Sequence, residues 1–328
     1  MQHRVWLVET PGGEFRQVEQ ARPTPGIGEV LVRIAASGVN PLDTKIRSGK
    51  AAHARQPLPA VLGLDMAGTI EEVGAGVTAF KVGDEVFGMA GGVGGHQGTL
   101  AEFVTVDADL LAHKPGNLSM REAAALPLST VTAWEGLVDR AKVHGNQKVL
   151  IHAGAGGVGH VCVQIARAFG AEVFATVSNE KKHIVENFGA TPIDYRATSV
   201  ADYVQFHTNG LGFDIVYDTV GGATLDASFE AVKRYTGHAL SCLGWGSYSL
   251  APLSFRGATY SGVFTLLPLL TGQGRAHHGE IFAQAANLAE EGKLKPLMNE
   301  RRFSTADIAA AHAAVEAGST GKVVVEIM

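Results

Sequence analysis

A glycine-rich turn between a strand and a helix is the feature that most limits how this chain can fold. Residues 148–152 form a short apolar run typical of a buried strand, and residues 157–169 have the spacing of an amphipathic helix. The turn between them contains Gly154, Gly156 and Gly159, which satisfy the spacing GxGxxG. A strand, a glycine turn and a helix in this order begin a βαβ unit.

Each glycine of the turn has its own physical role. Gly154 permits the tight turn, Gly156 lets the backbone approach a pyrophosphate, and Gly159 lets the helix pack closely on the strand. The first turn of the helix also offers backbone N–H groups and a partial positive charge to an anion. The sequence therefore predicts a dinucleotide site made of Gly154, Gly156, Gly157, Val158 and Gly159.

The end of the next strand distinguishes the two nicotinamide dinucleotides. Sites for NAD usually place a carboxylate there, which accepts from the ribose 2′-hydroxyl group. In this chain the strand of residues 172–177 ends in the neutral Ser178, and Lys182 follows one helical turn later. A 2′-phosphate would meet no carboxylate and could pair with the lysine, so we predict NADPH as the cofactor. The alternative is a solvated helix start with ordinary surface lysines.

The segment around the glycine turn alternates strands with helices. Helical patterns that end at Gly170 and Gly189 suit the left-handed cap of a helix. This alternation is typical of a doubly wound parallel sheet, so we predict an α/β nucleotide-binding domain over residues 121–265. The expected strands are residues 148–152, 172–177, 191–195, 213–220 and 238–243, and one helix is expected over residues 120–138.

The two ends of the chain are predicted to form the other domain together. A length of 328 residues suggests about two domains. The first third of the chain contains short β segments. The segment after residue 266 contains too few helices and strands for a domain of its own. We therefore predict a β-rich, partly open barrel-like catalytic domain from residues 1–120 and 266–328. Its expected strands are residues 29–34, 68–73, 103–106, 322–327 and one near 295–298; its expected helices are residues 280–291 and 305–317, the second capped by Ser304.

Composition excludes several classes of partner. Hydrophobic residues make up 46% of the chain and charged residues 18%, and the formal net charge is -5 without a block of like charges. These values suit a globular protein and indicate neither nucleic acid nor membrane as a partner. The two cysteines, Cys162 and Cys242, do not form a CxxC pair, and the N-terminus lacks the apolar core of a signal peptide. We expect a soluble cytoplasmic protein.

Several segments together resemble the zeta-crystallin-type quinone oxidoreductases of the medium-chain dehydrogenase/reductase superfamily. The match extends over nearly the whole chain. It comprises the glycine turn and residues 38–49, 63–68, 132–136, 193–196, 217–221 and 321–324. The resemblance implies a GroES-like catalytic domain beside a Rossmann domain, and a homodimer that pairs through the last strand of the nucleotide sheet, near residues 258–263.

The resemblance also implies a site without zinc. Zinc alcohol dehydrogenases of the same superfamily carry a cysteine near the position of Asn40 and a histidine at the position of Leu64. A catalytic zinc needs three protein ligands of nitrogen, sulfur or carboxylate type. Two of the family's ligands are replaced here, and the four-cysteine structural zinc lobe is absent from the sequence. We therefore expect no metal.

Without zinc, another group must stabilise the oxyanion that forms on the substrate. The resemblance implies that Asn40 lies near the nicotinamide and the substrate, where its amide could donate. Tyrosines of the family are replaced by Lys45 and Ala51, so Lys45 is the next candidate donor, with Asp43 or Asp65 to hold it. The alternative is a structural salt bridge between these loops.

The same resemblance assigns the rest of the cofactor groove. Thr132 would lie beside the nicotinamide and Tyr195 near the 2′-phosphate. The groove would be lined by Gly221, Leu243, Gly244, Val263 and Phe264. Each residue could instead have a purely structural role. Thr132 could be an ordinary hydroxyl on a helix, Gly221 and Gly244 could form turns at strand ends, and Val263 and Phe264 could pack in the core.

Three functions remain open from the sequence. The first is hydride transfer from NADPH to a quinone or an α,β-unsaturated carbonyl compound, and the loss of both tyrosines favours the second substrate. The other two are a dinucleotide-binding protein with a structural or sensing role, and an enoyl-thioester reductase.

Overall fold

The computed structural model describes residues 1–327, and these divide into two compact units. The first unit contains residues 1–131, 266–292 and 296 onward; the second contains residues 132–265 and 293–295. The first boundary therefore lies between Val131 and Thr132, later than the predicted one at 120. The helix that begins at Pro127 starts within the first unit, where the Leu128 backbone N–H donates to Asp65.

The second unit is built on a six-stranded parallel sheet. The strand order is β11-β10-β9-β12-β13-β14, with every neighbouring pair parallel. Its strands are β9 (Lys148–Ile151), β10 (Glu172–Val177), β11 (Thr191–Asp194), β12 (Ile215–Asp218), β13 (His238–Ser241) and β14 (Thr259–Gly262). Most side chains of β9, β10, β12 and β13 are buried, as expected where helices cover both faces. The predicted doubly wound fold is confirmed.

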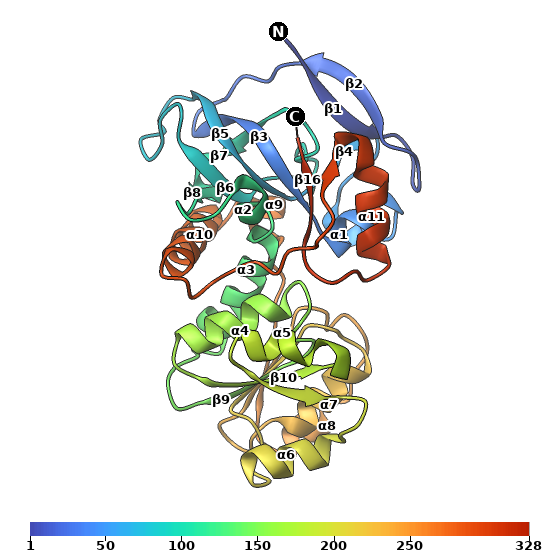
Figure 1. The fold of residues 1–328 in the computed structure, drawn as a ribbon, viewed down its shortest axis with the longest axis vertical. Helices are drawn as coiled ribbons and strands as arrows, with labels where there is room; N and C mark the ends of the chain where they lie inside the picture. Colours follow the sequence, from blue (N-terminus) through green and yellow to red (C-terminus); the bar gives the residue numbers. More distant parts are fainter. Residues whose placement is uncertain (328) are drawn as a thin grey trace. The chain divides into compact units, whose positions relative to one another are not determined.

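Helices cover both faces of this sheet (Figure 1). On one face lie α4 (Gly159–Ala168) and α5 (Lys182–Asn187), and on the other lie α6 (Val200–Thr208), α7 (Ala223–Ala231) and α8 (Ala251–Ser254). Leu150, Phe174 and Val216 point to the second face, where they pack against Tyr203 and Phe229. The short 3-10 helix η4 (Asn179–Lys181) precedes α5, and the π-helix η3 (Glu135–Arg140) precedes β9.

The first unit is β-rich, as predicted. One sheet has the order β15-β16-β3-β5-β6-β8, with β7 also paired to β3, and a second has the order β2-β1-β4. The strands are β1 (Gln2–Val8), β2 (Arg16–Ala21), β3 (Glu29–Val39), β4 (Ala60–Val61), β5 (Asp65–Val73), β6 (Glu85–Met89), β7 (Phe103–Asp107), β8 (Leu111–His113), β15 (Phe303–Ser304) and β16 (Val323–Glu326). Among the described residues the end strands β15 and β8 do not pair, so the larger sheet stays open.

The helices of the first unit are short except for one. They are α1 (Pro41–Arg47), α2 (Met120–Ala123), α3 (Pro127–Trp134, which crosses the boundary), α9 (Leu267–Thr271), α10 (Arg275–Glu290) and α11 (Ile308–Glu316), with 3-10 turns η1 (Ala52–Ala54), η2 (Ala108–Leu110) and η5 (Thr305–Asp307). Ser304 is the predicted cap, and it forms a capping box with Asp307 at the start of η5, directly before α11.

Two predicted elements were wrong. The single helix over residues 120–138 is divided into α2, α3 and η3. Pro127 separates α2 from α3, because it has no N–H to continue a helix and instead begins a new one, whereas α3 continues directly into η3. No strand forms at residues 295–298, where Pro296 lacks a donor for a ladder and only Met298 makes an isolated bridge, to Lys322.

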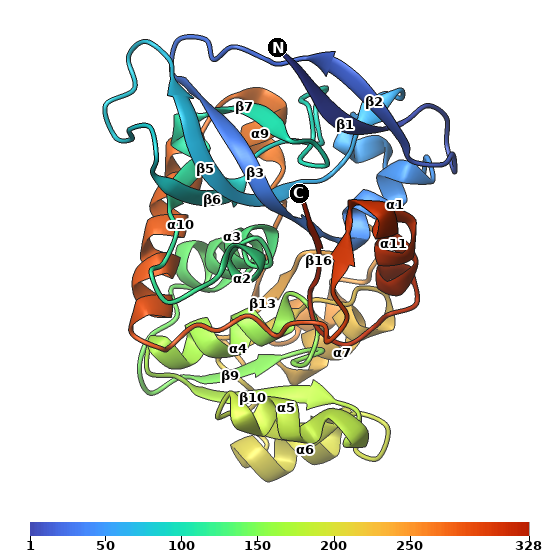
Figure 2. The same cartoon turned by 45° about the horizontal axis from the view of Figure 1, so that its top comes forward.

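The centre of the larger sheet brings distant residues together. β3 lies between β16 and β5, as Figure 2 shows. In the registers, Val39 pairs with Val323 and Gly38 pairs with Asp65. The residues that follow or precede these pairs, Asn40 and Lys322, therefore meet at one end of three adjacent strands.

Candidate functional site

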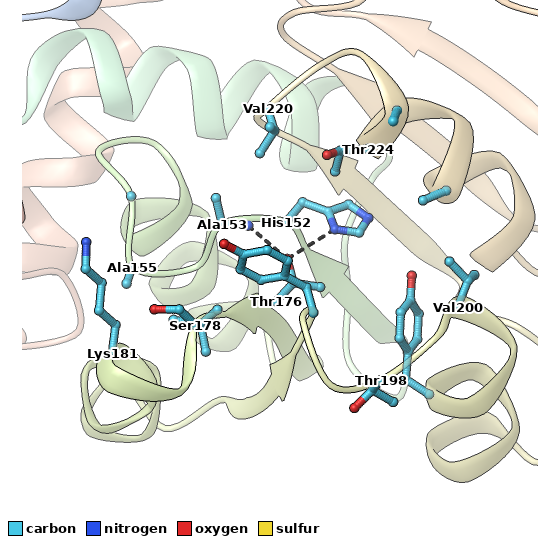
Figure 3. A pocket seen from close by; sticks show the side chains of 16 residues that line it. His152, Ala153, Ala155, Thr176, Ser178, Lys181, Thr198, Val200, Val220 and Thr224 are labelled. Atoms are coloured by element: carbon cyan, nitrogen blue, oxygen red, sulfur yellow. Dashed lines mark hydrogen bonds between the residues drawn. The ribbon is translucent and has the colours of Figure 1, made fainter. Parts of the chain in front are cut away.

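A cavity of about 530 Å³ lies in the second unit at the carboxyl ends of the parallel strands (Figure 3). Its walls come from the ends of β9, β10 and β12, the segment after β11, and the first turns of α6 and α7. The lining residues are His152, Ala153, Ala155, Gly156, Thr176, Val177, Ser178, Lys181, Tyr195, Thr198, Val200, Tyr203, Val220, Ala223, Thr224 and Ala227. β9 is the strand at which the order reverses, which is where ligands bind in doubly wound sheets.

The glycine turn leaves no room for side chains at two of its positions. A Cβ atom on Gly159 would lie 2.0 Å from the Ala153 carbonyl oxygen, and one on Gly154 would lie 2.4 Å from the Ala175 Cβ. At Gly156 the nearest atom would be 3.0 Å away, and this residue lines the cavity. The turn thus packs closely on the sheet through Gly154 and Gly159 while Gly156 keeps its backbone open to a ligand, which fits a dinucleotide pyrophosphate.

The polar end of the cavity contains Ser178, Lys181 and Tyr195. Figure 3 shows the Lys181 side chain beside Ser178 and Ala155. Lys182, the residue predicted from sequence, does not line the cavity and begins α5 instead. Sequence reasoning missed Lys181 because the phase of a short 3-10 turn decides which of two adjacent lysines faces a ligand.

The remaining predicted cofactor residues lie outside the cavity lining. In the second unit, Thr132 accepts a hydrogen bond from the Tyr217 hydroxyl through its carbonyl at 2.6 Å. Gly221 has φ of +81° and donates to Asp218, so it forms the turn after β12. The others that do not line the cavity are Gly154, Gly157, Val158, Gly159, Leu243, Gly244, Val263 and Phe264.

The first unit contains a buried polar cluster around Asn40. The Asn40 side-chain amide donates from Nδ2 to Asp65 Oδ2 at 2.9 Å, and its Oδ1 accepts from Lys322 Nζ. The Asn40 backbone N–H donates to Asp43 Oδ2 at 2.7 Å, and the other Asp65 oxygen accepts from Leu128 N–H at 2.9 Å. Asn40, Asp43, Asp65 and Lys322 are all at most 5% exposed.

Burial dominates the charge state of this cluster. It raises the pKa of Asp43 to about 7 against the opposing Asn40 N–H, and raises the pKa of Asp65 to about 6 against the opposing charge of Lys322. Burial lowers the pKa of Lys322, which the two aspartates oppose. Asp43 Oδ1 is buried without a hydrogen bond of ordinary geometry, and the Gly63 N–H nearby also favours its charged form.

Lys322 takes the place that the sequence suggested for Lys45. Lys45 is exposed on α1, and within residues 1–327 it forms no ion pair with Asp43 or Asp65. The expected bridge between Lys45 and either aspartate is therefore absent from the described residues. Lys322 escaped sequence reasoning because it lies 282 positions from Asn40 and only sheet pairing brings them together.

The donor set in this part of the chain does not fit a zinc ion. Asn40 is bonded to Asp65 and Lys322, and the buried Leu64 offers no ligand atom. In residues 1–327 no group of three or more His, Cys, Asp or Glu is placed to hold a metal ion. Over the same residues, no helix is both long enough and apolar enough to cross a bilayer.

Two family models match the chain. Residues 26–116 match the alcohol dehydrogenase GroES-like domain, and residues 188–325 match the zinc-binding dehydrogenase model. The first range lies in the β-rich unit. The second covers the later strands of the six-stranded parallel sheet and the C-terminal segment that belongs to the β-rich unit.

Curated relatives include reductases of conjugated carbonyl compounds. The chain is 36% identical to 2-methylene-furan-3-one reductase of Solanum lycopersicum over 90% of this chain and 71% of that protein. It is 33% identical to the chloroplastic NADPH-dependent alkenal/one oxidoreductase of Arabidopsis thaliana over 98% and 79%. A mycocerosic acid synthase-like polyketide synthase of Mycobacterium tuberculosis is 40% identical over 66% of this chain, which spans only 10% of that synthase.

Solved structures share the whole fold. An alcohol dehydrogenase superfamily protein from Novosphingobium aromaticivorans superposes with a TM-score of 0.97 at 55% identity, covering 99% of this chain and 100% of the other. The quinone oxidoreductase from Coxiella burnetii gives 0.84 at 27% identity, with 100% of both chains covered. The CurK enoyl reductase gives 0.85 at 30% identity, covering 100% and 99%.

Proposed function

The chain belongs to the medium-chain dehydrogenase/reductase superfamily, and we propose that it is an NADPH-dependent reductase that transfers hydride to an α,β-unsaturated carbonyl compound or a quinone. The observation that carries the proposal is the cavity in which the glycine turn, Ser178 and Lys181 lie together. A neutral serine with an adjacent lysine suits a 2′-phosphate and offers no carboxylate to repel it.

The chain's own residues bind and orient the cofactor, which supplies the hydride when bound. Gly156 and the first turn of α4 would face the pyrophosphate, and Lys181 with Tyr195 would face the 2′-phosphate. The Asn40 amide donates one of its two hydrogens to Asp65, and Lys45 is an exposed ammonium. We propose these two donors for the oxyanion that develops on the substrate.

An enoyl thioester is the second candidate substrate. It is favoured by the 40% identity to a polyketide synthase and by the similarity to the CurK enoyl reductase. The chemistry is the same, because an enone and an enoyl thioester both present a carbon–carbon double bond conjugated to a carbonyl group.

Assembly and location complete the proposal. β14 is an unpaired edge of the described sheet, so a second copy could extend the sheet there and form a homodimer. Cys162 and Cys242 are free thiols, which suits the reducing cytoplasm.

One substrate panel tests the proposed function. Oxidation of NADPH and of NADH is followed with a naphthoquinone, an alkenal, a cyclic enone and crotonyl-CoA. We expect turnover with NADPH and at least one conjugated carbonyl compound. Lys181→Ala should reduce the preference for NADPH over NADH by about 1–2 kcal/mol, or roughly five- to thirtyfold, whereas the matched variant Lys182→Ala should leave it unchanged. Turnover with none of the four acceptors would instead favour a structural or sensing role.

A further inference from the structure

The residue that begins the glycine turn has an unusual backbone conformation. Ala153 has φ of +55°, in the left-handed region that residues with a side chain seldom adopt. Ala153 also lines the cavity, directly before Gly154. A strained residue at a ligand site persists only where its surroundings hold it.

Thr176 holds two consecutive amides of this turn. Its hydroxyl Oγ1 accepts from the Ala153 N–H at 3.1 Å, and its carbonyl oxygen accepts from the Gly154 N–H at 3.0 Å. The Ala153 carbonyl in turn accepts from the Gly156 N–H at 2.8 Å, which closes the turn. Thr176 lies near the end of β10, and it is buried.

The His152 ring lies beside the Thr176 hydroxyl. In the register of β10 with β9, Ala175 pairs with Ile151, so Thr176 and His152 are the next neighbours. His152 Nδ1 lies 3.2 Å from Thr176 Oγ1, and Figure 3 shows both contacts meeting at this hydroxyl. Burial lowers the pKa of His152 to about 4, so the ring is neutral at pH 7. The hydroxyl already accepts from Ala153 and can therefore donate its proton to Nδ1.

We propose that Thr176, oriented by His152, is a positioning residue that holds Ala153 in the left-handed conformation and so fixes the path of the glycine turn that would face the cofactor pyrophosphate. The inference rests on the proposed function, since it takes a dinucleotide as the ligand. Thr176 acts through the backbone of its neighbours. Its loss should therefore affect ligands that reach the glycine turn and spare ligands that reach only the 2′-phosphate end.

Two ligands separate these effects. NADP⁺ carries the pyrophosphate, whereas adenosine 2′-monophosphate carries only the part that would lie near Ser178 and Lys181. Both are titrated by calorimetry into wild type, Thr176→Val, Thr176→Ser and the double variant Thr176→Val with Ala153→Gly. Valine keeps the shape of threonine without its hydroxyl, serine keeps the hydroxyl, and glycine adopts positive φ without strain.

We expect Thr176→Val to weaken NADP⁺ about tenfold and adenosine 2′-monophosphate by less than about twofold. Thr176→Ser should bind both ligands like wild type, and adding Ala153→Gly to Thr176→Val should restore most of the affinity for NADP⁺. Equal weakening of both ligands, unchanged NADP⁺ affinity in Thr176→Val, or no recovery in the double variant would overturn the inference. If wild type binds neither NADP⁺ nor, in a parallel titration, NAD⁺, the proposed function fails instead.

Discussion

Lys322 is a buried ammonium group whose neighbours compensate for its charge. Lys322 Nζ donates a hydrogen bond to Asn40 Oδ1, and Asp43 and Asp65 lie close enough to favour the charged form of the lysine. A buried ion that keeps its partners is tolerated, whereas removing one partner leaves the others uncompensated. The exposed Lys45 on the same unit provides the natural comparison, because its charge is solvated.

Lysine-to-methionine substitutions at these two positions should therefore change the free energy of unfolding by very different amounts. Lys322→Met should lower the free energy of unfolding by roughly 3–5 kcal/mol, since Asn40 Oδ1 loses its donor and two acidic groups lose their cation. Lys45→Met should change it by less than about 0.5 kcal/mol. Thermal melts measure both. If Lys45→Met melts like wild type but single-turnover hydride transfer falls, the oxyanion role is supported; an unchanged rate would remove Lys45 from the mechanism.

Asp43 should make the stability depend on pH. Burial raises its pKa to about 7, so the folded chain holds this proton more tightly than the unfolded chain does. The stabilisation from protonated Asp43 is fully present below its unfolded pKa of about 4 and is lost as the pH rises through 7. Above that pH the group no longer changes the free energy of unfolding. The total is at most roughly 4 kcal/mol, and Asp65, with its pKa raised to about 6, contributes in the same direction.

Asp43→Asn isolates this contribution. Asparagine still accepts from the Asn40 N–H but cannot ionise, so the variant should gain stability relative to wild type as the pH rises from 5 to 8. Urea unfolding at several pH values measures the difference. Asp226→Asn, an exposed change on α7, is the control. Its free energy of unfolding should follow the same pH dependence as that of wild type. Parallel curves for both variants would contradict the assignment.

Among the elements, the turn between β9 and α4 combines close packing with a place in the proposed binding site. Gly159 and Gly154 allow the helix and the sheet to approach, and Gly156 faces the cavity. One motif therefore contains glycines needed for two different reasons, and substitution should separate them.

Alanine at Gly159 and at Gly156 should have different consequences. At Gly159 the new Cβ would lie 2.0 Å from the Ala153 carbonyl oxygen, so the turn must shift. We expect a loss of about 1–3 kcal/mol of stability. Gly156→Ala should stay within about 1 kcal/mol of wild type while weakening NADP⁺ by about tenfold or more, because the methyl group lies where the pyrophosphate would approach. Denaturant melts and calorimetric titration measure the pair; equal destabilisation would refute the division of roles.

At the scale of the whole molecule, the edge strand β14 is the feature that bears on assembly. Thr259 and Gly262 on this strand are exposed, and its other edge pairs with β13. An unpaired edge of this kind either is protected or pairs with another chain.

We expect light scattering at micromolar concentration to give twice the chain mass of 34.3 kDa. Thr259→Lys places a charge on the edge and should shift the protein toward the monomer. Thr10→Lys, at another exposed threonine, should not. A monomeric wild type would exclude pairing through β14.

Much of the second unit follows from local sequence. Strands such as β9 and β10, and the helix that ends before Gly170, depend on residues only a few positions apart in the chain. Their patterns can therefore be recognised from the sequence. The glycine turn is equally local, because GxGxxG describes the steric demands of one turn. The divided helix at Pro127 and the missing strand at Pro296 were errors of the same local kind.

Contacts between strands were decided only by the tertiary structure. Lys322 meets Asn40 because β16 pairs with β3, and no short pattern encodes the order or register of a sheet. The choice of Lys181 over Lys182 follows from the phase of η4, and Ala153 is left-handed because Thr176 on the neighbouring strand holds its N–H. Local sequence specified which chemical groups are available and which turn is predicted to receive a dinucleotide. Packing determined which of those groups face one another, since that depends on residues up to 282 positions apart.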